Sequence, residues 1–318
     1  MADIYEQAHF DEDPGEVYVT PEERFADLLR YDFAPNYIEW RGLKMHYTDE
    51  GPKDGSQKGT FLMVHGNPGW SYLYHDWIPQ LVQDGYRCIA LDLIGHGRSD
   101  KPTNRNWYSV RKHIDSVSHL ISALNLTSVN LVVQDWGGII GLSNILTRPN
   151  LFDRLFIFNT AIAHHGFHFA EGLQVWKETT RDPAKYATDM PVGDIVSMSL
   201  RVNTAEKDEM KTAFDAPWPD VKSKASIMQF PFLIPYDDDR SPLRNLCEDV
   251  FQALKKWDHC PVHFVFGDDD WTYPWDWAVE WSSQVPGATL DRIQGASHFV
   301  QIENADACVG AIRNRLAA

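Results

Sequence analysis

The sequence predicts an α/β fold, in which a mostly parallel, twisted sheet is flanked by helices and a helical cap domain is inserted. From residue 60 onward, short apolar runs alternate with longer amphipathic stretches. This alternation is lost between residues 160 and 235 and returns after residue 260. Alternating buried strands and helices are typical of parallel sheets, because each crossover between parallel strands needs a long connection. The irregular segment between two such stretches indicates an insertion.

Several short apolar runs have the composition of strands that are buried on both faces. They are residues 61–64, 88–91, 129–133, 155–158, 262–266 and 288–293. Amphipathic stretches near 107–125 and 136–148 predict helices between these strands. Upstream, residues 37–40 and 43–47 flank an Arg-Gly pair, which predicts an antiparallel hairpin.

We divide the chain into a core domain of residues 1–159 and 236–318 and a cap domain of residues 160–235. The cap segment lacks regular apolar runs and carries many Met, Trp and Pro residues. Segments inserted at the carboxyl ends of parallel strands usually build the ligand site, because side chains from several loops converge there. We therefore expect the cap to contribute to the ligand site.

The acidic composition limits the expected partners. The 318 residues include 29 Lys and Arg against 45 Asp and Glu, a formal net charge of −16. Such a field repels phosphate backbones and anionic membranes, so neither nucleic acid nor a membrane is expected as a partner. No run approaches the ~18 apolar residues that span a bilayer, and residues 1–6 are acidic where a signal peptide is basic. We expect a cytoplasmic protein that is a monomer or a small homo-oligomer.

The four cysteines lie far apart and lack the spacing of metal ligands, which predicts reduced thiols and no metal site.

Asp135 is the strongest candidate for a nucleophile. It lies between a predicted strand and the glycines Gly137 and Gly138, at a sharp turn into a predicted helix. In α/β hydrolases the nucleophile sits on such a turn, although this chain has neither Ser nor Cys there. A carboxylate at this place attacks an electrophilic alkyl carbon and forms an ester. The structural alternative is an Asp that only caps the helix.

The run His-Gly-Asn-Pro at residues 65–68 follows another predicted strand directly. In α/β hydrolases this loop supplies one backbone N–H of the oxyanion hole, and the residue after the nucleophile supplies the other. Asn67 and Trp136 are therefore the expected oxyanion-hole residues.

His298 follows the last predicted strand, where the histidine of a catalytic triad belongs. A histidine in this role needs a carboxylate that fixes its tautomer and stabilises its charged form. Three aspartates follow the strand at 262–266, and we prefer Asp270 as the acid, with Asp269 next. The other place for the acid, after the strand at 155–158, holds Asn159, which has no carboxylate.

Together these blocks resemble the haloalkane dehalogenases of the α/β-hydrolase superfamily over nearly the whole chain. The matching blocks are residues 65–74, 92–102, 133–138 and 298–301. Epoxide hydrolases share several of them, but a Trp directly after the nucleophilic Asp favours dehalogenation. The resemblance implies an α/β-hydrolase fold and hydrolysis of a haloalkane to the primary alcohol, a halide ion and a proton through a covalent alkyl-aspartate ester. It implies no metal and no organic cofactor.

The resemblance makes Asp135 the nucleophile, His298 the base and Asp270 the acid. It also implies that two indoles hold the halide, which are Trp136 and, from the cap, Trp176. Asn67 stands where the best-matching relatives have Glu, and it either assists these indoles or replaces Trp176. Four apolar residues are expected to line the substrate pocket or to form the core of the cap: Leu173, Phe214, Phe230 and Pro231.

Two other functions compete with dehalogenation. An epoxide hydrolase uses the same triad but needs cap tyrosines that protonate the opening oxygen, and Tyr186 and Tyr236 are available. Trp136 argues against it, because an indole N–H is a poor proton donor to an alkoxide. A non-catalytic protein that binds a small ligand on this fold would not need a complete triad.

Overall fold

The computed structural model describes residues 12–317, so the acidic N-terminal residues 1–6 lie outside the described part. Its main sheet has eight strands in the order β10-β9-β8-β7-β4-β5-β3-β2. They are β2 (Asn36–Trp40), β3 (Leu43–Glu50), β4 (Thr60–Val64), β5 (Arg87–Leu91), β7 (Val129–Gln134), β8 (Phe152–Phe158), β9 (Val262–Gly267) and β10 (Thr289–Ile293). The strands from β10 to β5 run parallel, and β2 and β3 pair antiparallel as a hairpin. The predicted strands and the hairpin are confirmed. A second, small sheet pairs β1 (Val17–Tyr18) with β6 (Lys101–Pro102).

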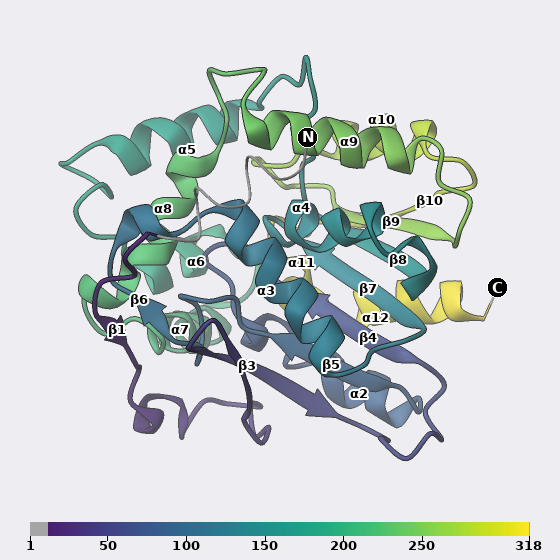
Figure 1. Ribbon diagram of the computed structural model, residues 1–318, viewed down its shortest axis with the longest axis horizontal. Coiled ribbons are helices and arrows are strands. Elements are labelled where there is room, and N and C mark those ends of the chain that lie inside the picture. Colours follow the sequence, from purple (N-terminus) through teal and green to yellow (C-terminus); the bar gives the residue numbers. More distant parts are fainter. Residues whose placement is uncertain (1–11, 318) are drawn as a thin grey trace.

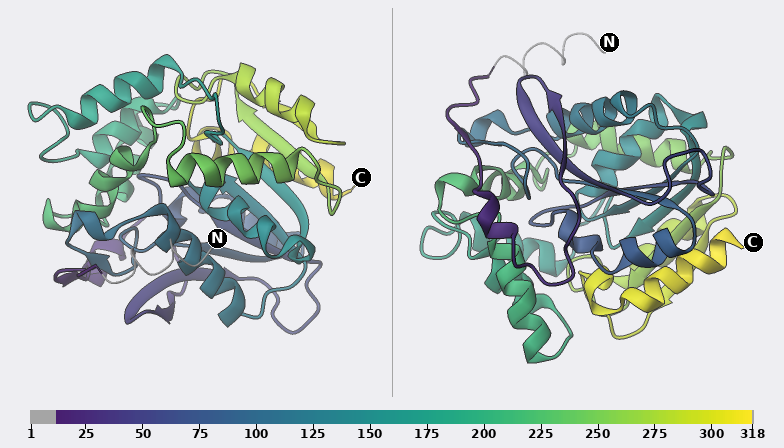
Figure 2. Two further views of the ribbon diagram at one scale, coloured as in Figure 1. Left: turned by 45° about the horizontal axis from the view of Figure 1, so that its top comes forward. Right: turned by 90° about the horizontal axis from the view of Figure 1, so that it is seen from below.

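Side chains of the central strands alternate between two apolar layers. Leu62 and Val64 of β4 belong to one layer, and Phe61 and Met63 belong to the other. The first layer includes helices α3 (Val110–Ala123), α4 (Gly137–Leu142), α9 (Pro242–Leu254) and α10 (Trp275–Gln284). The second includes α2 (Trp77–Gln83), α11 (Val300–Glu303) and α12 (Ala305–Leu316). Figure 1 shows α3 in front of the sheet, and the right panel of Figure 2 shows α2 and α12 side by side on the other face.

The two helices predicted in the first half of the chain are confirmed, but one begins later than expected and the other ends earlier. The helix expected at 107–125 begins at Val110, because Ser109 caps it by accepting a hydrogen bond from the Lys112 N–H. The helix expected at 136–148 is α4, which ends at Leu142 and continues as a 3₁₀ turn over Ser143–Leu146.

Between β8 and β9 the chain forms a group of helices at one side of the sheet (Figure 1). They are α5 (Glu171–Arg181), α6 (Val192–Ser199), α7 (Thr204–Asp215) and α8 (Ala225–Leu233). The assignment of residues 160–235 to a cap domain and of the remainder to a core domain stays a prediction. Within residues 12–317, no helix is both long and apolar enough to cross a bilayer. The cysteines Cys88, Cys247, Cys260 and Cys308 are unpaired.

The turn from β7 into α4 depends on the close approach of α4 to strand β4. Asp135 adopts a φ of 53°, a conformation that is uncommon for any residue except glycine. Its carbonyl oxygen accepts hydrogen bonds from the Gly138 N–H at 2.9 Å and from the Thr160 hydroxyl at 2.6 Å. A Cβ atom on Gly137 would collide with the carbonyl oxygen of Val64. The helix can therefore start at Gly137, two residues after Asp135, only because residue 137 has no side chain.

We expect Gly137→Ala to destabilise the protein by about 1–3 kcal/mol, because the methyl group overpacks against backbone that cannot give way. Gly310→Ala is the matched control, since a Cβ atom there meets no other atom within 4 Å. That control in helix α12 should stabilise the protein by roughly 0.5–1 kcal/mol. Urea unfolding of the three proteins measures both effects. Equal midpoints for the two variants would contradict the role given to Gly137.

Candidate active site

Asp135 lies beside the two backbone donors that the sequence predicts for it. The Asn67 N–H donates to Asp135 Oδ1 at 2.6 Å. The Trp136 N–H also stabilises the charged carboxylate. Asp135 is 7% exposed, so these donors act in a largely water-free environment where hydrogen bonds are stronger. The arrangement matches an oxyanion hole built around one carboxylate oxygen.

His298 lies between Asp135 and Asp270. Its Nδ1 lies 3.0 Å from Asp270 Oδ2, and its Nε2 lies 3.7 Å from Asp135 Oδ2. Because Asp270 accepts from Nδ1–H, the Nε2 atom of the neutral ring carries the lone pair that accepts hydrogen bonds. The Gln134 amide nitrogen lies 3.1 Å from this Nε2 and 3.3 Å from the His298 carbonyl oxygen. This tautomer leaves the basic nitrogen next to the nucleophile.

Asp270, and not Asp269, is the aspartate that contacts the histidine. The Asn159 amide donates to Asp270 Oδ2 at 2.8 Å, and the N–H groups of Thr272 and Tyr273 donate to Oδ1 at 2.8 and 3.0 Å. Asp270 is 5% exposed. Asp269 is more than half exposed and pairs with Arg201. The buried acid is therefore held in place by three donors besides the imidazole.

The charges of this site act on one another. Burial raises the pKa of Asp135, although His298 and the N–H groups of Trp136 and Asn67 oppose that shift. Burial also disfavours protonated His298, but the carboxylates of Asp270, Asp135 and Glu303 outweigh it and raise the pKa of His298. The histidine is thus tuned by several neighbouring anions.

A cavity of 360 Å³ opens beside Asp135 and His298. The sequence-predicted residues that line it are Asn67, Asp135, Trp136, Leu173, Trp176 and His298. Helices α5 and α6 supply further lining residues, and a smaller neighbouring cavity of 40 Å³ shares Asp135, Trp136 and Leu173. The structure thus places the predicted nucleophile, the predicted base and both predicted indoles around one cavity.

Three of the four apolar residues, Phe214, Phe230 and Pro231, line neither cavity, so for them a packing role is favoured over that of a pocket wall. Phe214 packs against Tyr72 and Phe299 in the second apolar layer. Phe230 packs against Trp136 from behind the cavity lining, with ring centroids 5.1 Å apart, and Pro231 is buried within α8. For Phe230 and Pro231 the reason is that α8 carries apolar residues on nearly every side, so its sequence does not tell which of them faces a cavity.

Three residues that contact the triad were missed by the sequence reasoning. The Tyr273 hydroxyl donates to Asp135 Oδ2 at 2.8 Å. Gln134 contacts His298, and Asn159 orients Asp270. Gln134 ends β7 directly before Asp135, and Asn159 follows the last residue of β8. Tyr273 lies three residues after Asp270. That position is a signal for Gln134 and Asn159, whereas the contact of Tyr273 depends on how the loop after β9 folds.

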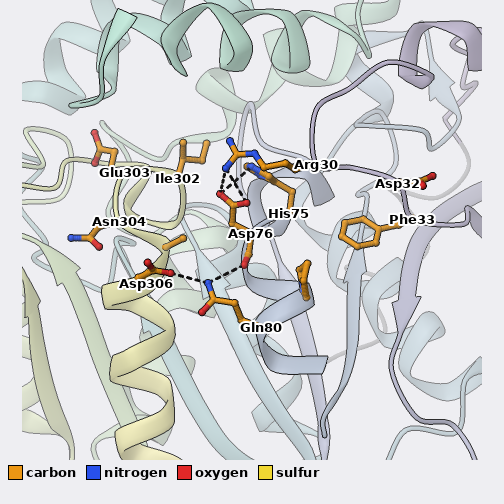
Figure 3. Close-up of a pocket in the computed structure, with 12 residues that line it drawn as sticks. Arg30, Asp32, Phe33, His75, Asp76, Gln80, Ile302, Glu303, Asn304 and Asp306 are labelled. Atoms are coloured by element: carbon orange, nitrogen blue, oxygen red, sulfur yellow. Dashed lines mark hydrogen bonds and ion pairs between the residues drawn. The ribbon is translucent and has the colours of Figure 1, made fainter. Parts of the chain in front are cut away.

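Another cavity, of 740 Å³, lies elsewhere, and no triad residue lines it (Figure 3). Among the lining residues, Arg30 donates two hydrogen bonds to the Asp76 carboxylate, and the Gln80 amide donates one to Asp306. Glu303 lines this cavity and also accepts a hydrogen bond from the N–H of Ser297, the residue before His298. It therefore connects this cavity to the triad. Within residues 12–317, no group of three or more His, Cys, Asp or Glu side chains is arranged to hold a metal ion.

The sheet topology and the strand–helix turn that carries Asp135 are those of the α/β-hydrolase fold. A family model described as the α/β hydrolase fold matches residues 59–305. A haloalkane dehalogenase of Psychrobacter cryohalolentis is 35% identical over 256 residues, which cover 79% of this chain and 81% of that protein. The chain therefore belongs to the haloalkane dehalogenase family.

Two other proteins are similar over more of the chain. The haloalkane dehalogenase DpaA of Paraglaciecola agarilytica NO2, whose structure is tetrameric, has 30% identity and a TM-score of 0.85. The similarity covers 94% of this chain and 98% of that chain. A cis-3-alkyl-4-alkyloxetan-2-one decarboxylase of Shewanella oneidensis is 28% identical over 287 residues, which cover 89% of this chain and 88% of that protein.

We expect halide release at saturating substrate to fall as the pH drops through the pKa of His298, because only neutral imidazole accepts a proton from water. Glu303→Gln removes one of the charges that raise this pKa, so the acidic limb should move to lower pH by less than about one unit. Glu280→Gln, an exposed change of the same charge in α10, is the control. A limb that moves equally in both variants, or upward in the first, contradicts this assignment. The measurement is kcat against pH.

Proposed function

We propose that this protein hydrolyses haloalkanes to the primary alcohol, a halide ion and a proton. The observation that carries this proposal is the position of Asp135. Its Oδ1 is held by the Asn67 N–H at 2.6 Å, and the same carboxylate lines a cavity together with Trp136 and Trp176. A carboxylate with one oxygen restrained and a neighbouring pocket of neutral donors suits the displacement of a halide from carbon.

In the first step an oxygen of Asp135 attacks the carbon, the carbon–halogen bond breaks, and the electron pair leaves with the halide. Neutral N–H donors suit this leaving group, because they stabilise a large anion without holding it as a fixed cation would. Among residues 12–317, the indole N–H groups of Trp136 and Trp176 have no acceptor, so both are available to a halide.

Asn67 supports these indoles and does not replace them. One hydrogen of its amide nitrogen is used by the Ile227 carbonyl at 3.3 Å, and its Oδ1 lies 3.2 Å from His96 Nε2. An amide nitrogen carries a second hydrogen, which remains for the halide. We therefore assign the halide to two indoles and one amide.

In the second step His298 takes a proton from water, which attacks Cγ of Asp135. The oxyanion that forms on Oδ1 is stabilised by the Asn67 and Trp136 N–H groups. Gln134 and Asp270 keep the ring of His298 oriented for this transfer. The tetrahedral intermediate collapses and the alcohol leaves. The Asp135 carboxylate is restored, and a proton is released.

We further propose that residues 160–235 act as the cap that excludes bulk water from this chemistry. Leu173 and Trp176 of α5 are the lining residues that support this role. Excluding water strengthens the contacts to the departing halide and keeps the carboxylate poorly hydrated. We propose that the protein works in the cytoplasm as a monomer or a small homo-oligomer.

The geometry does not favour epoxide hydrolysis. Tyr236 donates its hydroxyl to the Leu173 carbonyl at 2.7 Å, and only Tyr186 of the two expected tyrosines lines the cavity beside the triad. Release of halide and acid from 1-bromobutane or 1,2-dibromoethane, with styrene oxide and a 3,4-dialkyl oxetan-2-one as alternative substrates, tests the assignment. Turnover of either alternative without halide release, or tight binding of a haloalkane without turnover, contradicts it.

His298→Phe should permit alkylation but block hydrolysis, because water then lacks its base. We expect one bromide released per active site with 1-bromobutane, followed by no further turnover. Intact-protein mass spectrometry should show a stable gain of one butyl group on residue 135. Continued turnover in this variant contradicts the role of the histidine.

Trp136→Phe and Trp176→Phe should each lower kcat/KM for 1-bromobutane by about 10²-fold, the effect of removing one donor to a developing anion. Both changes should also weaken inhibition by added bromide. Trp271→Phe is the matched control, since Trp271 lines the same cavity but is 56% exposed. If bromide inhibits Trp176→Phe as strongly as it inhibits the control, Trp176 is not a halide ligand.

A further inference from the structure

Tyr273 is anchored at the reacting carboxylate by several independent contacts. It belongs to the loop between β9 and α10, and its side chain is buried, with 7% exposed. Its ring stacks on that of His298, with centroids 5.3 Å apart and planes inclined by 29°. Its N–H donates to Asp270 Oδ1 at 3.0 Å, and its hydroxyl donates to Asp135 Oδ2 at 2.8 Å. The hydroxyl is therefore held against the nucleophile from two sides of the triad.

The two oxygens of Asp135 have different partners. Oδ1 accepts from the Asn67 N–H, which assigns it to the oxyanion hole. Oδ2 accepts from the Tyr273 hydroxyl and lies 3.7 Å from His298 Nε2. If Oδ1 stays in the oxyanion hole, Oδ2 is the oxygen that bonds to the substrate carbon. It then becomes the bridging oxygen of the ester.

The second step of the proposed reaction breaks the bond between Cγ and this bridging oxygen. Water has by then bonded to Cγ, and its proton has passed to His298. The electron pair of the Cγ–Oδ2 bond goes to Oδ2, which departs as the oxygen of the alcohol and must gain a proton. The donors at Oδ1 stabilise the oxyanion but not this second, leaving oxygen.

We propose that Tyr273 is a further catalytic residue, whose hydroxyl donates a hydrogen bond to Oδ2 as it leaves Cγ. The bond stabilises the developing alkoxide until His298 returns its proton to that oxygen. Atoms and charge balance without further reactants: the water oxygen stays on Asp135, the old Oδ2 leaves with the alcohol, and Tyr273 keeps its proton. One proton of the water reaches the alcohol through His298, and the other is released when the carboxyl group ionises. This inference rests on the proposed function, since it needs the alkyl-aspartate ester.

The tyrosine is suited to donate a hydrogen bond without losing its proton. Burial raises the pKa of Tyr273 well above its usual range, and the carboxylates of Asp135 and Asp270 raise it further. The same hydrogen bond withdraws charge from Oδ2 during alkylation. Removing it should therefore affect the two steps in opposite directions, whereas loss of a merely structural contact would slow both.

Tyr273→Phe tests the proposal, because it keeps the ring that packs on His298 and removes only the hydroxyl. With 1-bromobutane, we expect a bromide burst at least as fast as that of the wild type. Hydrolysis of the ester should slow by about tenfold to a hundredfold, the effect of losing one donor to a developing negative charge. Rapid-quench kinetics with intact-protein mass spectrometry should show the butyl ester accumulating. Tyr186→Phe, a cavity residue that lacks a hydrogen bond to Asp135, is the matched control.

The alcohol that leaves provides a second readout. The 2-bromoethyl ester from 1,2-dibromoethane releases a more acidic alcohol than the butyl ester, so its hydrolysis should be slowed less in Tyr273→Phe. A chain with 3-fluorotyrosine at position 273 has a stronger hydroxyl donor and should hydrolyse the butyl ester faster than the wild type. This second variant tests the role even if Tyr273→Phe fails to fold.

Absence of ester accumulation, equal slowing of both steps, or equal slowing of both esters in folded Tyr273→Phe would overturn the proposal. So would slower hydrolysis in the fluorotyrosine protein. A wild-type protein that releases no bromide is a different result, because it overturns the proposed function itself.

Discussion

The contact between helix α4 and strand β4 is the constraint on which the rest of the site depends. Because Gly137 has no side chain, the helix begins there, two residues after Asp135, and packs against the carbonyl of Val64. Asp135 is thereby held at a positive φ, with its carboxylate between the N–H groups of Asn67 and Trp136. A helix that packed further from the sheet would move the nucleophile away from both donors. Tight backbone packing is thus the origin of the local chemistry.

Much of the fold and the residues nearest to the chemistry could be predicted from the sequence, because both depend on local order along the chain. Buried strands have a distinctive composition, and the ends of parallel strands converge at one edge, which brings Asp135 and His298 together. The contact of Tyr273 could not be predicted, since it depends on how one loop folds back over the sheet. Phe230 was misplaced because burial and cavity lining give the same apolar signal. Packing in three dimensions separates them.

Asp270 connects the imidazole of His298 to the loop that carries Tyr273. One of its oxygens contacts the imidazole of His298, and the other accepts the backbone N–H groups that shape the loop carrying Tyr273. Asn159, which follows the neighbouring strand β8, donates a hydrogen bond to the same carboxylate. Without a carboxylate at position 270, the N–H groups of Thr272 and Tyr273 would lose the oxygen that they share, so in this chain the location of the acid and the order of that loop are linked.

The 3.7 Å separation of His298 Nε2 and Asp135 Oδ2 makes the basicity of the imidazole depend on the stage of the catalytic cycle. In the resting protein the charge of Asp135 contributes to raising the pKa of His298. In the proposed reaction, esterification of Asp135 abolishes that charge, so the pKa of the imidazole falls once the substrate is attached. The ring then sheds its proton more readily at the moment when water has to be activated. The charge of Asp135 thereby controls when His298 can act as the base that regenerates this carboxylate.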